Sequence, residues 1–200
     1  MEKEKLLAIV EALIFASEKP LKIKYIEQVL SVIQLENITI PELIEELRNR
    51  YAVEDSGIEL VEVAEGWQFR TKPQFAEWIK RLSTVKPAKL SQPAMETLAI
   101  VAYRQPITRA EIDYIRGVDS GAVIKTLLDK RLIKIVGKKE LPGRPLVYGT
   151  TQEFLEVFGL KDISSLPSLQ DIKQISSRNE ESEKNQPELP LPVPESREEE

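Results

Sequence analysis

The feature that most limits how this chain can fold is an internal repeat. Residues 12–30, ALIFASEKPLKIKYIEQVL, align with residues 98–116, LAIVAYRQPITRAEIDYIR, so that a proline and a buried-type aliphatic residue fall at matching places. Further along, residues 69–79, FRTKPQFAEWI, align with residues 148–158, YGTTQEFLEVF, in the same order. Two matched segments in one order indicate that the chain contains the same structural unit twice.

Each copy is predicted to contain three helices, a two-stranded ribbon and a final helix. In the second copy Ser91 can cap a helix that ends near 104, and Thr108 with Glu111 forms a capping box for a short helix that ends near Gly117. Asp119 can cap the third helix. The stretch RLIKIVGKKELPGRPLVYGT then alternates as two strands around a turn rich in glycine and proline.

The first copy follows the same order. Its helices are expected at 3–17, 22–31 and 40–51, and the third is capped by Thr39 and Glu42. The segments GIELVEVA and GWQFRTK are its strands. Three helices followed by a two-stranded wing is the winged-helix arrangement, a relative of the helix-turn-helix.

The sequence therefore predicts an α+β fold, mainly helical, with two tandem winged-helix domains. Their expected bounds are 1–84 and 85–161. Residues 162–200 are poor in aromatics and rich in Glu, Ser and Pro, so we expect a disordered acidic tail.

Composition argues against an enzyme. The chain has no histidine and no cysteine, which excludes the usual zinc site, a Ser-His-Asp triad and a Cys-His pair. We find no glycine-rich loop that would hold a phosphate among the eight glycines. We therefore expect no catalytic residue, cofactor or metal. No apolar run reaches the roughly 18 residues that span a bilayer, so a cytoplasmic protein without membrane contact is expected.

Charge makes the first domain a poor candidate for DNA binding. Residues 1–84 contain 11 basic and 15 acidic side chains, whereas residues 85–161 contain 13 basic and 8 acidic ones. Affinity for nucleic acid depends on neutralising phosphates. The third helix of the second copy begins with Asp119 and small residues, which offer little to base edges. Sequence-specific binding is therefore not expected, and weak non-specific DNA contact at the second domain stays open.

The first helix has an unusually wide apolar surface. Its apolar residues between 6 and 15 cover about 240° of the helix, whereas a surface helix that faces one core needs about 100°. Either the helix is central to its own domain, or one face meets another chain. We favour a two-fold homodimer and assign its interface to Leu6, Val10, Leu13 and Ile14.

Residues 90–160 closely resemble the bacterial segregation and condensation protein B family, ScpB. The resemblance rests on ETLAIVAYRQPITRAEI, on IRGV followed by a serine, and on GRPLVYGTT followed by EFLEVFGL. The first domain fits by order and length. The resemblance implies a non-enzymatic subunit of the SMC–kleisin complex, which condenses and segregates chromosomes at the nucleoid. It also implies a homodimer that binds the kleisin ScpA and, through it, SMC. The alternatives are a winged-helix transcription regulator and an enzyme that uses carboxylates or Tyr103.

The kleisin is expected to bind mainly on the second domain, because tyrosine and arginine, the types that dominate interface energies, are concentrated there. The candidate residues are Tyr103, Arg104, Arg109, Arg116, Arg144 and Tyr148. Two alternatives remain for members of this group. Arg144 can pair with Glu140, and Tyr148, like Tyr114, can be a half-buried core residue.

Overall fold

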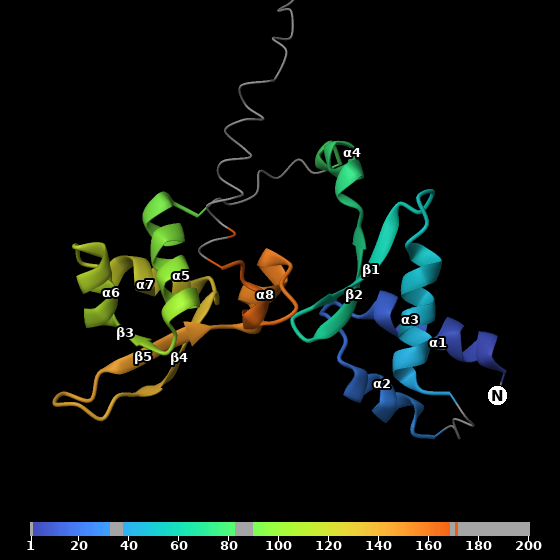
Figure 1. The fold of residues 1–200 in the computed structure, drawn as a ribbon, viewed down its shortest axis with the longest axis horizontal. Helices are drawn as coiled ribbons and strands as arrows, with labels where there is room; N and C mark the ends of the chain where they lie inside the picture. The colour runs from blue at the N-terminus through green and yellow to red at the C-terminus, as the bar shows by residue number, and fades with distance from the viewer. Residues whose placement is uncertain (1, 33–37, 83–89, 169–170, 172–200) are drawn as a thin grey trace, which may run out of the picture. The chain divides into compact units, whose positions relative to one another are not determined.

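The computed structural model describes residues 2–32, 38–82, 90–168 and 171. Within them two winged helices follow one another along the chain, as predicted (Figure 1). The predicted boundary at 84/85 and most of the predicted acidic tail lie outside the described residues.

The first winged helix contains three helices, a ribbon and a short final helix. Its elements are α1 (Lys3–Ala16), α2 (Ile23–Leu30), α3 (Ile40–Tyr51), β1 (Ile58–Val63), β2 (Gly66–Thr71), the 3-10 turn η1 (Pro73–Phe75) and α4 (Ala76–Lys80). The predicted capping box is present at the start of α3, where the Thr39 hydroxyl accepts from the Glu42 N–H and the Glu42 carboxylate accepts from the Thr39 N–H. The three helices start and end within a residue of their predicted bounds.

The dimer interface assigned to α1 is wrong for three of its four residues. Leu6, Val10 and Ile14 are at most 2% exposed and belong to the core of their own domain, together with side chains of α2, α3 and β1. Leu13 is half-buried and packs against that core. The helix is apolar over a wide arc because neighbouring elements cover it on several sides, which is the alternative that the sequence left open.

The ribbon of the first domain closes through a two-residue turn. Ala64 and Glu65 have positive φ values of 51° and 59°, as the tight turns of hairpins require. β2 also approaches the chain before α2, since Leu21 and Trp67 exchange two backbone hydrogen bonds of 2.8 and 2.9 Å. At Gly66 a side chain would lie 2.7 Å from the backbone of Pro20, so glycine is needed at this approach.

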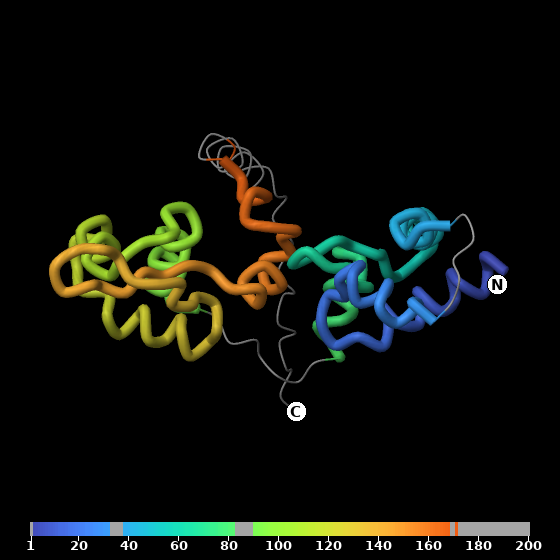
Figure 2. The backbone as a smooth tube through the Cα atoms, turned by 90° about the horizontal axis from the view of Figure 1, so that it is seen from below, coloured from blue at the N-terminus to red at the C-terminus, as the bar shows by residue number. Residues whose placement is uncertain are grey.

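The second winged helix repeats this order with a three-stranded sheet. Its elements are α5 (Gln92–Arg104), β3 (Ile107–Thr108), α6 (Arg109–Arg116), α7 (Gly121–Asp129), β4 (Ile133–Lys138), β5 (Leu146–Thr150), α8 (Gln152–Phe158) and the 3-10 turn η2 (Ile163–Ser165). The sheet order is β3-β5-β4, and both pairs are antiparallel. The turn between β4 and β5 forms the far end of the ribbon in both views (Figure 1, Figure 2).

Two local features of the second copy differ from the sequence expectation. The short strand β3 was not predicted, although its Ile107 aligns with Leu21, which makes the equivalent bridge in the first copy. Ser91 precedes α5 without a side-chain capping bond. By contrast, the capping box of Thr108 and Glu111 is present, and the Asp119 carboxylate accepts the Gly121 N–H at 2.9 Å.

Candidate functional site

A groove beside α6 presents two large exposed apolar side chains of the second winged helix. Tyr114 is 89% exposed and Ile115 is 50% exposed, so both lie outside the core. The groove begins where α5 ends and follows β3 and α6. Its lining residues are Arg104, Pro106, Ile107, Ala110, Glu111, Tyr114 and Ile115. Large exposed side chains around a hollow are typical of a protein-binding surface.

The groove has one uncompensated charge within the described part of the chain. Glu111 is neutralised, because the Lys139 ammonium lies 2.7 Å from its carboxylate and the Thr108 backbone N–H and hydroxyl also donate to it. Arg104 is exposed and makes no ion pair with a described residue. The surface therefore fits a segment with apolar side chains and an acidic group.

The pKa of Glu111 provides a test of this local geometry. Lys139, followed by the two Thr108 donors, lowers the pKa of Glu111 from about 4.5 to about 2. A depressed pKa adds stability that is present above pH 4.5 and is lost as the pH falls from there toward 2. Because the side chain is 45% exposed, we expect less than about 1 kcal/mol.

We therefore expect Glu111→Gln to flatten the pH dependence of stability between pH 4.5 and about 2. Glutamine keeps the capping box but has no charge to lose. Urea unfolding followed by circular dichroism measures the effect. If the free energy of unfolding changes with pH by the same slope in the variant and the wild type, Lys139 does not hold the carboxylate in solution.

Three of the six residues predicted to bind a partner instead stabilise the domain. Tyr148 is only 8% exposed. The Arg116 side chain is 9% exposed, donates to the Ser120 hydroxyl at 3.2 Å and lies 3.6 Å from Glu96. These contacts join the helices of the domain, so neither residue offers a binding surface.

Arg109 is also engaged within the domain. Its guanidinium pairs with Asp119 and, at 3.4 Å, with Asp113, whose carboxylate accepts the Ser120 N–H at 2.7 Å. These contacts fix the connection between α6 and α7. Arg109 is therefore held by these two carboxylates although its side chain is half exposed.

The other three predicted residues remain on the surface. Tyr103 is 40% exposed at the end of α5. It precedes Arg104, which lines the groove. Arg144 lies in the turn of the wing with φ +41°, is 70% exposed and is 3.6 Å from Glu140, the pairing that the sequence left as an alternative. Arg104 lies at the end of α5 and Arg144 lies between β4 and β5. Of the two, only Arg104 lines the groove.

Tyr114 is exposed in the groove, so of the two tyrosines only Tyr148 is the core residue that the sequence left as an alternative. Ile112 is fully buried in the same short helix, and a residue two positions later points about 200° away from it. The spacing from Ile112 was the available signal.

The third helices present acidic as well as basic side chains on their exposed sides. The exposed residues of α7 are Ala122, Lys125, Thr126 and Asp129. Lys125 is the one cation among them, and Asp129 would repel a phosphate. On α3, Glu45 and Glu46 pair with Arg48 and Lys3, so this helix also presents acidic groups. The arrangement agrees with the expectation that neither domain reads a sequence.

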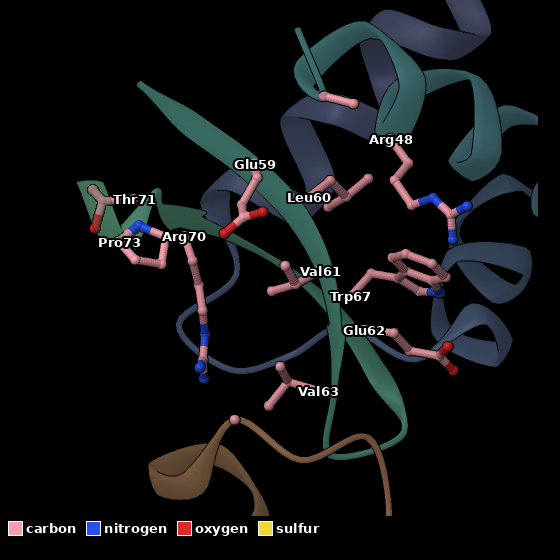
Figure 3. A pocket seen from close by; sticks show the side chains of 12 residues that line it. Arg48, Glu59, Leu60, Val61, Glu62, Val63, Trp67, Arg70, Thr71 and Pro73 are labelled. Atoms are coloured by element: carbon pink, nitrogen blue, oxygen red, sulfur yellow. The ribbon is translucent and has the colours of Figure 1, made fainter. Parts of the chain in front are cut away.

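Two further hollows lie on the first winged helix. One follows the outer side of α1 and is lined by Ala8, Glu11, Ala12, Phe15, Tyr51, Ile58 and Phe69. Phe15 is 76% exposed there. The other follows β1, between α3 and the end of the ribbon (Figure 3), and Gly159 of the second copy also lines it.

The described residues give no sign of a metal site or of a membrane span. They contain no group of three or more acidic, histidine or cysteine side chains that could hold a metal ion. None of their helices is long and apolar enough to cross a bilayer.

Comparison with known proteins identifies close relatives along almost the whole chain. The family described as "Segregation and condensation complex subunit ScpB" matches residues 8–169. "Segregation and condensation protein B" of Syntrophotalea carbinolica is 49% identical over 180 residues, which cover 90% of each chain.

Two solved structures also match parts of this chain. ScpB from Mycobacterium tuberculosis is 32% identical, covers 80% of this chain and 98% of its own, and has a TM-score of 0.38. A structure described as a dimer of the ScpB N-terminal domain complexed with ScpA peptide is 33% identical. It covers 40% of this chain and 96% of its own, with a TM-score of 0.36.

Proposed function

Because the chain belongs to the ScpB family of segregation and condensation complex subunits, we propose that it is a non-enzymatic subunit of a bacterial SMC–kleisin complex. In this role it binds the kleisin ScpA and acts at the nucleoid in chromosome condensation and segregation. The observation that carries the proposal is 49% identity over 90% of a curated relative. The lack of a phosphate-binding loop in the sequence agrees with ATP hydrolysis by the SMC partner.

We further propose that the chain acts as a homodimer, with the interface on the exposed side of α1. A 33% identical relative is described as a dimer of this domain bound to an ScpA peptide. In this chain Ala8, Ala12 and Phe15 share one side of α1, and two of them are small enough for a second helix to approach closely. This exposed side of α1 lies away from the buried Leu6, Val10 and Ile14, which the sequence had suggested as the interface.

The kleisin surface is proposed to be the groove beside α6, where Arg104 and Tyr114 are exposed. Sequence-specific gene regulation is not favoured, because the curated relatives are segregation and condensation proteins and the third helices present acidic side chains beside their basic ones. Weak non-specific DNA contact through the exposed basic residues of the second domain remains a secondary proposal. A salt titration with random-sequence duplex would measure it.

Light scattering on the purified chain tests the dimer and the partner together. We expect the mass of two copies for the chain alone and a stable complex when recombinant ScpA is added. Phe15→Asp should give a folded monomer, because a charge would replace the largest exposed apolar group of the interface. A monomeric wild type would contradict the proposed homodimer. Failure to bind ScpA would contradict the proposed function.

A further inference from the structure

The outer edge of β1 is an open strand edge in the described part of the chain. β1 pairs only with β2, in a regular register from Ile58 opposite Thr71 to Val63 opposite Gly66. In an antiparallel pair, residues alternate between those that bond across to the partner and those that direct N–H and C=O outward. Which residues of β1 point outward can be determined from the neighbouring contacts.

Trp67 fixes this alternation. Its N–H and C=O bond to Leu21 on the far side of β2, so Trp67 and the opposite residue, Glu62, do not bond to each other. Every second residue of β1 shares this orientation. Glu62, Leu60 and Ile58 therefore direct their backbone groups toward the outer edge.

The two ends of this edge are occupied. The Ser56 hydroxyl donates to the Ile58 C=O at 2.7 Å and accepts the Ile58 N–H at 3.3 Å. At the other end, the N–H groups of Ala64 and Glu65 donate to the carbonyls of Leu160 and Lys161 at 2.9 and 2.8 Å.

Between these ends, the outward groups of Leu60 and Glu62 have no hydrogen-bond partner among the described residues. Leu60 packs its side chain into the core and also lines the hollow beside β1. Unpaired N–H and C=O groups at a strand edge are a template for a further strand, which would satisfy them.

A hollow lies beside this edge and is lined by five consecutive residues of β1, Glu59 to Val63. Figure 3 shows Glu59, Val61 and Val63 on one side of β1 and Leu60, Glu62 and Trp67 on the other. Arg48 of α3, Ala52 just after this helix, and Gly159 of the second copy also line the hollow. An added strand would place alternate side chains against the two sides, as in other cases of strand addition.

The equivalent edge in the second domain is protected, which makes the open edge of the first domain informative. β4 has a register shift between Ile135 and Gly137, and Lys134 and Lys138 are exposed on it. A bulge and lysines are devices that prevent further strand pairing.

β1 has neither device, since its sequence is IELVEV and its register is unbroken. Its two acidic residues face basic ones, because Glu62 lies 3.0 Å from Lys161 and Glu59 is directly opposite Arg70. Of two copies of one fold, one is protected against strand addition and the other is open to it.

We propose that the outer edge of β1 binds an extended segment of a partner chain by strand addition. Resting on the function proposed above, we assign this segment to the kleisin. A second copy of this chain fits less well, because the open stretch from Leu60 to Glu62 is only about 10 Å long. A stable dimer needs about 800 Å² on each partner.

Replacing Glu62 with proline tests the proposal. Proline lacks the N–H, and at this position only the outward donor is removed, because the Glu62 N–H takes no part in the pairing with β2. Glu62→Ala is the matched control, since it loses the same carboxylate and the same pairing with Lys161 but keeps the N–H. In calorimetry with full-length ScpA, we expect affinity to fall about tenfold for Glu62→Pro and to stay within twofold for Glu62→Ala.

Amide exchange of the wild-type chain, measured by NMR, gives a second test that needs no variant. Addition of ScpA should slow exchange at the Leu60 and Glu62 amides at least tenfold. The Val61 amide already bonds to β2 and should change less.

The outcomes separate the two proposals. If the wild type binds ScpA, yet both variants bind equally well and the two amides are unaffected, strand addition at β1 is wrong and the proposed function stands. If the wild type does not bind ScpA, the proposed function fails. If Glu62→Pro, but not Glu62→Ala, converts a wild-type dimer to a monomer, a second copy occupies the edge and the kleisin assignment is overturned.

Discussion

Replacing Val10 with aspartate should unfold the first winged helix, whereas Phe15→Asp on the same helix should leave it folded. Val10 is fully buried among the apolar side chains of α1, α2 and α3, and Phe15 is 76% exposed. An unpaired charge in an apolar interior costs on the order of several kcal/mol. This is a large part of the roughly 5–15 kcal/mol that stabilises a typical domain.

Tryptophan fluorescence during urea unfolding measures this effect in the correct domain. The chain has two tryptophans, Trp67 and Trp78, and both belong to the first copy. Val10→Asp should show a red-shifted emission with little or no urea. Phe15→Asp should keep the folded emission without urea and unfold cooperatively, at a midpoint lowered only by the loss of dimer association. A wild-type midpoint for Val10→Asp would place this side of α1 on the surface.

The contrast between these two positions shows why the dimer interface could not be assigned from the sequence. The periodicity of α1 correctly indicated a helix that is apolar over a wide arc. It could not say which part of the arc is covered by the same chain, because that depends on how α2, α3 and β2 pack around the helix. The exposed side contains two alanines and a single aromatic, which is a weaker pattern than the buried side.

Local signals predicted the fold well, and long-range contacts explain what was missed. The capping boxes at Thr39 and Thr108 fixed the starts of two helices, because the cap depends on residues three positions apart. β3 is only two residues long, and it is defined by pairing with β5, some 40 residues later in the chain. A strand of this length has no periodicity that could reveal it.

The candidate site was predicted in part for the same reason. Choosing tyrosine and arginine in the second domain was sound chemistry, and Arg104 does line the groove. Arg109 and Arg116 were misassigned because their acidic and hydroxyl partners are brought close only by the turn between α6 and α7. The open edge of β1 could not be predicted, since it depends on which backbone groups remain unpaired after folding.

The double substitution Arg104→Ala with Tyr114→Ala should weaken ScpA binding about 30-fold. Tyr114 offers the largest exposed ring of the groove, and Arg104 is its one cation that has no ion-pair partner among the described residues. If each contributes about 1 kcal/mol as an interface residue, the loss is about 2 kcal/mol. Calorimetry measures the affinity, and circular dichroism shows that the variant remains folded.

A matched control removes the same chemistry from other surfaces. Tyr25 is 56% exposed on α2, and Lys125 is exposed on α7, so Tyr25→Ala with Lys125→Ala also removes one ring and one cation. Because neither lines the groove, we expect its affinity to stay within about twofold of the wild type. A folded groove variant that binds as tightly as this control would exclude the α6 groove. The edge of β1 would then be the remaining proposed kleisin surface, since Glu62→Pro tests it independently of both substitutions.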